Sequence, residues 1–389
     1  MTPSYAYTKL AKRISLAPGQ AVTDDSSYHE LNQGPLPQHE AVTSRQSYHN
    51  FKTLLHSRSR SLHNPLGIIT LVLILLCVLL SAWIAHLTDG SRRLPGDRFD
   101  ELFDPRIIKS GSSIWDSERQ SLIRRAYPVA VHSHNDYWRR IPLFEALGSG
   151  CISIEADVHL RHSDLLVGHK SSHLRTEANL RAMYLNPLER ILKARNTNMT
   201  TGDWHGMFEL ASHQTVVLLV DLKTEGRETL AVLSMQLQPL RDLGYLTHWN
   251  GTTRVLRPLT VVATGNAPFL NNNTYRDIFW DAKLNCLVSE HDTLDYYFYN
   301  LSNSYYASMQ WSNALSQDVK TKVYGNIAMQ IEHAKARGLI ARYWDTPVQP
   351  PNMRDMVWRT LMENGVGILN MDDMGIVRDR GKGWGYINL

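Results

Sequence analysis

From Pro128 onward, short apolar and β-branched runs alternate with longer segments of helical periodicity. Several of the helical segments are followed by a glycine, as at Gly148, Gly244, Gly338 and Gly365. A repeated order of strand, helix and glycine is typical of a parallel α/β domain. The predicted strands are residues 129–133, 151–158, 216–222, 259–263, 286–289, 305–309, 339–344 and 367–370. Eight units over roughly 260 residues favour a closed (β/α)8 TIM barrel over an open sheet, with functional side chains at the C-terminal ends of the strands.

An uncharged apolar run at residues 66–85 also limits the architecture. Its length of about 20 residues is what a helix needs to cross a hydrocarbon core about 30 Å thick. Because a long polar segment precedes the run, it is predicted to be a retained transmembrane helix rather than a cleaved signal peptide. The expected organisation is a disordered tail at 1–63, the membrane helix, a linker at 86–126 and the barrel at 127–389.

Charge and glycosylation motifs predict the topology of this single-pass membrane protein. Slightly more Lys and Arg lie before the apolar run than after it, which favours a cytosolic N-terminus. Asn-x-Ser/Thr motifs at Asn198, Asn250, Asn272 and Asn300 all follow the run, which suits a lumenal or extracellular barrel. The formal net charge is +4, from 41 basic and 37 acidic residues. Such a balance does not suit a nucleic-acid surface, so no nucleic-acid partner is expected.

Three carboxylates are predicted to meet at the mouth of the barrel. Glu155 and Asp157 are two residues apart in a strand, so their side chains point to the same face. Asp221 ends the next long apolar strand and would point to the same space. Clustered carboxylates repel one another unless a cation lies between them, and their oxygens suit Mg²⁺ or Ca²⁺ better than zinc. An alternative is that Glu155 and Asp157 form internal salt bridges with arginines.

Two histidines follow extended segments near these carboxylates. His134 follows the first strand and His169 follows a short extended piece after the second. Near-neutral pKa values suit histidines for proton transfer, so one could act as base or nucleophile and the other as the acid that protonates a leaving group. Lys223, two residues beyond Asp221, could bind a phosphate oxygen or simply balance the charge of the carboxylates. The site is therefore predicted to be hydrolytic.

The run AVHSHNDYWRRIPLFEALGSGCISIEADVHLRHSDLLVGHK resembles the fungal group called altered inheritance of mitochondria protein 6, within the phospholipase-C-like phosphodiesterase barrel superfamily. The resemblance covers about residues 128–389. It implies that His134 and His169 are catalytic and that Glu155, Asp157 and Asp221 bind a metal. It also implies that the substrate is contacted by Lys223, Asn135 and Trp344. The expected activity is a membrane-anchored, metal-dependent phosphoric diester hydrolase that acts on a lipid or lipid-derived phosphodiester.

The sequence departs from the glycerophosphodiester phosphodiesterases of that superfamily. Those enzymes carry His-Arg-Gly at the first strand and a Pro-Glu-Asn-Thr turn soon after, whereas this chain has His134-Asn135-Asp136 and lacks the turn. The spacing of the site is closer to that of the spider-venom sphingomyelinase D branch.

Two other functions are compatible with the sequence. His132-x-His134, with His291 and an aspartate after the eighth strand, resembles the zinc site of amidohydrolase-type barrels. A catalytically inactive barrel that only binds its ligand at the membrane is the other alternative, because fold does not fix function.

Overall fold

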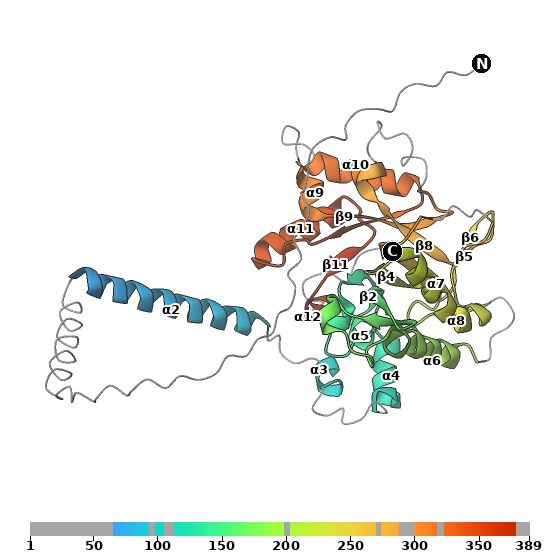
Figure 1. The fold of residues 1–389 in the computed structure, drawn as a ribbon, viewed down its shortest axis with the longest axis horizontal. Helices are drawn as coiled ribbons and strands as arrows, with labels where there is room; N and C mark the ends of the chain where they lie inside the picture. Colours follow the sequence, from blue (N-terminus) through green and yellow to red (C-terminus); the bar gives the residue numbers. More distant parts are fainter. Residues whose placement is uncertain are drawn as a thin grey trace, which may run out of the picture. The chain divides into compact units, whose positions relative to one another are not determined.

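The computed structural model describes residues 65–92, 98–104, 113–197, 203–269, 274–287, 299–316 and 323–378 (Figure 1). The chain divides into two compact units, Met1–Thr88 and Asp89–Leu389. The described part of the first unit belongs to helix α2 (Pro65–Arg92). The second unit holds every strand found among the described residues.

Helix α2 contains the apolar run. Its segment Pro65–Ala85 has 21 residues, is apolar enough to cross a membrane and is 0% buried. At 1.5 Å per residue the segment is about 31 Å long, close to the thickness of a hydrocarbon core. The helix expected at 66–85 is therefore present. The tail predicted at 1–63 lies outside the described residues.

The segment predicted as a linker, 86–126, contains three short helices. They are α3 (Arg98–Leu102), the 3-10 helix η1 (Ser113–Trp115) and α4 (Ser117–Arg124). Asp116 caps α4 by accepting a hydrogen bond of 2.9 Å from the backbone N–H of Arg119. Phe103 and Ile123 are fully buried and belong to the same hydrophobic core as the barrel strands. The described helices of this segment are therefore part of the folded domain.

Eight strands form the ring of the barrel. They are β1 (Val129–Ser133), β2 (Cys151–Arg161), β4 (Val216–Leu222), β7 (Leu259–Gly265), β8 (Ile278–Lys283), β9 (Ser304–Gln310), β10 (Ile340–Trp344) and β11 (Leu369–Met371). Their order is β10-β9-β8-β7-β4-β2-β1-β11, and all neighbours are parallel. No backbone ladder joins β10 to β11, although both strands are fully described. Arg342 Nε donates a 3.0 Å hydrogen bond to Asn370 Oδ1 across this seam. The predicted α/β barrel is confirmed as a nearly closed ring.

Strand β2 extends beyond the ring and forms a hairpin. It pairs with the short antiparallel strand β3 (Asp164–Val167), with Val158 opposite Val167. The two residues at the tip, His162 and Ser163, both have positive φ. The hairpin brings the chain after β3 back to the mouth of the barrel.

The fifth predicted strand, 286–289, is wrong. The fifth strand of the ring is β8, and Cys286 lies in the 3-10 helix η5 (Leu284–Leu287) that follows it. β8 has the sequence IFWDAK, in which two charged residues interrupt the apolar pattern. Asp281 points toward the interior of the barrel and contacts Arg342 there. A search for continuous apolar runs therefore passes over this strand.

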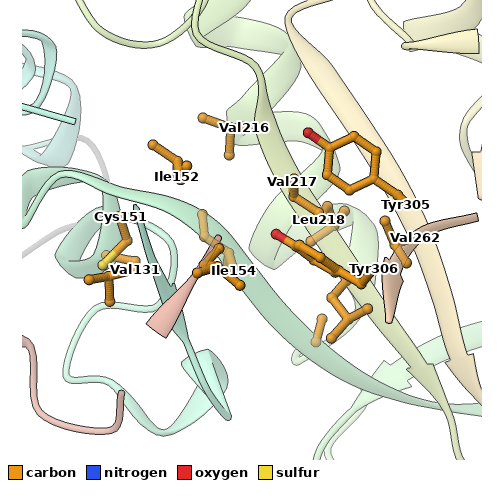
Figure 2. Close-up of a cluster of buried hydrophobic side chains, with 14 of the residues drawn as sticks. Val131, Cys151, Ile152, Ile154, Val216, Val217, Leu218, Val262, Tyr305 and Tyr306 are labelled. Atoms are coloured by element: carbon orange, nitrogen blue, oxygen red, sulfur yellow. The ribbon is translucent and has the colours of Figure 1, made fainter. Parts of the chain in front are cut away.

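Helices cover the ring between the strands. The longer ones are α6 (Asn186–Arg195), α7 (Gly226–Gln236), α10 (Val323–Ala336) and α11 (Pro351–Glu363), and the shorter ones are η2 (Asp136–Trp138), α5 (Phe144–Gly148), η3 (Ser171–His173), η4 (Arg181–Leu185), α8 (Gln238–Asp242), α9 (Trp311–Ser316) and α12 (Met374–Arg378). A small hairpin joins β5 (His248–Trp249) to β6 (Arg254–Val255). Figure 2 shows apolar side chains of several barrel strands gathered in the buried core, among them Ile154, Leu218 and Val262.

Candidate active site

Acidic side chains from two neighbouring strands meet at the C-terminal end of the barrel. Glu155 and Asp157 lie on one face of β2 because they are two residues apart. The register between β2 and β4 sets Asp157 opposite Asp221. Each of the three residues offers a ligand atom, and these atoms all lie within 4.8 Å of one another. The three predicted carboxylates are therefore adjacent, and their role as metal ligands stays a prediction.

The donor set of this cluster fits a hard divalent cation. Asp157 Oδ1 and Asp221 Oδ1 are buried and have no hydrogen-bond partner among the described residues. Lys223 Nζ lies 2.6 Å from Asp221 Oδ2 and 3.1 Å from Asp157 Oδ2, so one ammonium serves two carboxylates. Burial is the main reason that the pKa of Asp221 is raised, even though Lys223 opposes it. A cation such as Mg²⁺ or Ca²⁺ would supply the missing partner for both free oxygens.

Glu155 is paired with an arginine, as one alternative from the sequence expected. Arg342 Nη2 lies 3.5 Å from Glu155 Oε2. Burial by itself would raise the pKa of Glu155, but the charge of Arg342 opposes burial, and this pKa is held well below its usual range. Glu155 is therefore ionised. Within the described part of the chain no arginine pairs with Asp157 or Asp221, so the salt-bridge alternative does not extend to the other two carboxylates.

His132 is buried behind the site rather than exposed in it. Its side chain is 0% exposed, and Arg342 Nη2 donates to its Nε2 at 3.1 Å. Burial, followed by the charge of Arg342, lowers the pKa of His132 to about 3, so the ring is neutral. A ring that accepts at Nε2 keeps its proton on Nδ1, which donates to Ser153 Oγ at 2.7 Å. Both nitrogens are occupied, which argues against the zinc site of amidohydrolase barrels; His291 lies outside the described residues.

His134 lies at the mouth of the barrel, one residue after β1. Its backbone N–H donates to Met371 O at 3.0 Å, which fixes the turn out of the strand. Its Nδ1 lies 2.8 Å from Asp372 Oδ1 and its Nε2 lies 3.7 Å from Glu155 Oε2. A carboxylate at Nδ1 holds the proton on that nitrogen and leaves Nε2 able to accept one. This orientation suits a base or nucleophile, and the catalytic role of His134 stays a prediction.

His169 reaches the carboxylate cluster from the end of the β2–β3 hairpin. The N–H of Gly168 donates to Asp157 O at 3.0 Å, which holds the chain beside β2. His169 Nδ1 lies 2.9 Å from Asp157 Oδ2, and its ring packs edge-on against Trp138 with centroids 5.5 Å apart. Tyr137 OH donates to the same Asp157 oxygen at 2.7 Å. The side chain of His169 is 45% exposed, so it is accessible to a substrate.

The residues predicted to contact the substrate are not all in one place. Lys223 lies within the carboxylate cluster. Asn135 has a left-handed backbone with φ 49° and donates its N–H to Glu155 Oε2 at 3.1 Å, and its side-chain amide lies beside Tyr137 OH. Trp344 instead lines a separate cavity of about 400 Å³ at the ends of β7, β8, β9 and β10. The structure therefore brings together every predicted site residue except Trp344.

Sequence reasoning missed three residues that shape the site. Tyr137 holds Asp157, Arg342 holds Glu155 and His132, and Asp281 lines the cavity beside Trp344. Asp372, which the sequence offered only as the aspartate of the amidohydrolase alternative, instead orients His134. Burial and the charge of Asp157 raise the pKa of Tyr137, so its hydroxyl stays protonated and donates. A charged residue inside an otherwise apolar strand was the available signal for Arg342 and Asp281. For Tyr137 no comparable signal existed.

Comparison with known proteins identifies relatives of this chain. A family described as "AIM6-like phosphodiesterase domain" matches residues 120–281. A protein of Arthroderma benhamiae called altered inheritance of mitochondria protein 6 homolog is 36% identical over 273 residues, which cover 66% of this chain and 84% of that protein. A protein of Eremothecium gossypii called altered inheritance of mitochondria protein 6 is 35% identical, over 66% of this chain and 70% of that protein. A protein of the same name in Saccharomyces cerevisiae is 30% identical, over 70% of this chain and 77% of that protein. No solved structure matches the chain.

Proposed function

Because the chain belongs to the altered inheritance of mitochondria protein 6 family, which carries a phosphodiesterase domain, we propose that it is a metal-dependent phosphoric diester hydrolase of the phospholipase-C-like or glycerophosphodiesterase-like type. Its proposed substrate is a lipid or a lipid-derived phosphodiester. The observation that carries the proposal is the pair of histidines that contact two different carboxylates of one cluster. His134 contacts Glu155 and His169 contacts Asp157, and the two carboxylates are themselves adjacent.

The hydrogen bonds of the two histidines suggest different roles. His134 has a carboxylate on Nδ1, so its Nε2 can take the proton of an attacking hydroxyl or attack phosphorus itself. As the new bond to phosphorus forms, the bond to the leaving oxygen breaks, and that oxygen needs a proton. His169 can supply it, because Asp157 at 2.9 Å stabilises the charged imidazolium. The attacking hydroxyl can belong to water or to the substrate.

Positive charge is needed where the phosphoryl oxygens lie. When bound to Glu155, Asp157 and Asp221, a divalent cation would neutralise the negative charge of the phosphoryl oxygens. Lys223 Nζ, already beside two of these carboxylates, can turn toward a phosphoryl oxygen as a point charge. Arg342 is held by His132 and Glu155 and keeps Glu155 ionised.

The apolar helix supports the lipid part of the proposal. A retained helix at Pro65–Ala85 would keep the barrel close to a bilayer, where lipid phosphodiesters are concentrated. We propose a cytosolic N-terminus and a lumenal or extracellular barrel, since the four glycosylation motifs all follow this helix. Nucleic acid is not a proposed partner.

Alanine variants of the two histidines test the mechanism. In the full-length protein in detergent, His134→Ala and His169→Ala should each lower turnover of phosphodiesters by roughly 10²-fold or more, and the losses should be non-additive because the pair acts as a unit. Loss of His169 should matter less for nitrophenyl esters, whose leaving group needs no proton. Wild-type rates in both variants, on every phosphodiester that the parent cleaves, would exclude this mechanism.

Metal binding can be tested without an assay of activity. Mg²⁺ or Ca²⁺ should raise the melting temperature of the wild-type protein, because a ligand of the folded state stabilises it. Asp157→Asn should reduce this rise, since it removes a negative ligand that has a buried free oxygen. An equal rise in both proteins would remove Asp157 from the ligand set.

A further inference from the structure

The cavity lined by Trp344 lies beside the candidate site. It has a volume of about 400 Å³ and opens at the C-terminal ends of β7, β8, β9 and β10, on the far side of Arg342 from Glu155. Polar side chains line most of it, including Asn285, Ser308 and Gln310. Its volume is in the range of small ligand sites in proteins.

Asp281 gives this cavity its chemistry. The side chain is 5% exposed, and its Oδ2 accepts from Thr264 Oγ1 at 3.2 Å and lies 3.9 Å from Arg342 Nη1. The other oxygen, Oδ1, is buried and has no hydrogen-bond partner in the described part of the chain. A buried acceptor without a donor costs free energy, so such atoms in native proteins usually have a partner in the functional state. A hydroxyl of a bound ligand would supply the donor.

Charges of both signs lie around the cavity, so no ionic group is matched by all of them. Arg342 lies behind Asp281, and Lys283 lines the same wall, so an ammonium group would meet two positive charges. An anionic group would meet the carboxylate of Asp281. Neutral amide and hydroxyl side chains and the Trp344 ring make up much of the remaining wall. Sugars and cyclitols match such a surface, because their hydroxyls form hydrogen bonds and their C–H faces pack on aromatic rings.

We propose that this cavity binds an uncharged, hydroxyl-rich headgroup, such as a sugar, cyclitol or glycerol, while the attached phosphodiester lies at the carboxylate cluster. The inference rests on the proposed function and narrows its substrate class. Arg342 links the two regions, since it contacts Glu155 of the cluster and Asp281 of the cavity. Asp281 accepts a hydrogen bond from a headgroup hydroxyl and so determines specificity.

Asp281→Ala tests the inference, and Asp277→Ala is the matched control. Asp277 lies just before β8, at the opposite end of the strand, and pairs with Arg241 at 2.5 Å. Both variants break a largely buried Asp–Arg pair, but only the first changes the cavity. Asp281→Asn, which keeps the volume, serves if the alanine variant does not fold. The probes are lysophosphatidylinositol, lysophosphatidylglycerol and lysophosphatidylcholine in mixed micelles with the full-length protein.

We expect the wild type to prefer the two hydroxylated substrates. Asp281→Ala should lower kcat/KM for lysophosphatidylinositol by about 10- to 100-fold, the range for loss of a hydrogen bond to a charged group, and should leave lysophosphatidylcholine nearly unchanged. The rise of melting temperature with Mg²⁺ should persist. Equal losses on the inositol and choline substrates, or a wild type without preference for hydroxylated headgroups, would overturn the inference.

Failure of the proposed function gives a different result. In that case no phosphodiester is turned over, and calorimetry with myo-inositol 1-phosphate and phosphocholine decides the inference separately. Tighter binding of the inositol compound, lost in Asp281→Ala and kept in Asp277→Ala, supports the cavity. Equal binding of the two compounds refutes it.

Discussion

Gly265, the last residue of β7, lies directly beside the carboxylate of Asp221. Its φ is +69°, and a Cβ placed there would overlap Asp221 Oδ1 and lie 2.8 Å from Leu222 O. Asp221 Oδ1 is one of the two buried oxygens of the cluster without a partner. Gly265→Ala should therefore displace a proposed metal ligand without changing any ligand residue.

The cost has two parts that can be separated. A left-handed backbone at an alanine costs about 1–2 kcal/mol of stability. For a domain of this size, each kcal/mol lowers the melting temperature by roughly 2–4 °C. Gly244→Ala carries the same backbone cost, because its φ is +67°, but its Cβ would meet only the flexible end of Arg257, at 3.1 Å. The difference between the variants isolates the contact with Asp221.

Melting curves of both variants, with and without Mg²⁺ or Ca²⁺, measure this difference. Both variants should melt below the wild type without metal. Gly244→Ala should keep the full rise of melting temperature with metal, whereas Gly265→Ala should lose most of it and most of the phosphodiesterase activity. If Gly265→Ala responds to metal as strongly as Gly244→Ala does, Asp221 is not a ligand at this position or its carboxylate is free to move.

Three further predictions concern other parts of the chain. Asp372→Ala should lower kcat by about 10²-fold or more, with a smaller effect on KM, because it removes the hydrogen bond of 2.8 Å that orients the ring of His134. An unchanged kcat in steady-state assays would show that this aspartate does not orient the base. The contribution of His132 to the free energy of unfolding should fall as pH drops from about 6.5 toward 3, because His132 takes up a proton only in the unfolded chain in that window. Relative to the wild type, His132→Gln should remove this contribution in denaturant titrations at several pH values, and parallel pH dependences would contradict the buried neutral ring. Glycosidase treatment should increase the gel mobility of the wild type, and Asn250→Gln should reduce that shift, since Asn250 is exposed in the turn between β5 and β6. If no shift occurs and a protease reaches the barrel from the cytosol, the proposed topology is reversed.

The ring of strands could be predicted because most of its members are continuous apolar runs. β4 and β7 are of this kind, and their boundaries agree with the prediction within two residues. The carboxylates were found for the same reason, since each follows or interrupts such a run. β8 was not found, because Asp281 and Lys283 break its pattern.

The partners inside the barrel could not be predicted. The sequence offers many arginines, and nothing local indicates that Arg342, far along the chain, reaches Glu155 and His132. That contact depends on closure of the ring between β10 and β1 through β11. The same holds for Asp372, whose pairing with His134 is set by the end of β11. Long-range pairing of charged side chains is therefore information that only the three-dimensional fold supplies.

The β2–β3 hairpin allows the position of His169 to change only in steps of whole residues. Because a ladder changes register in whole residues of about 3.3 Å and each single step turns side chains to the other face, the loop cannot drift gradually in length. One residue inserted within the paired part of β3 would turn the histidine away, and two would carry it about 6.6 Å along the hairpin. In evolution, the paired lengths of β2 and β3 should therefore stay fixed, while the turn at His162 and Ser163 can lengthen without moving His169.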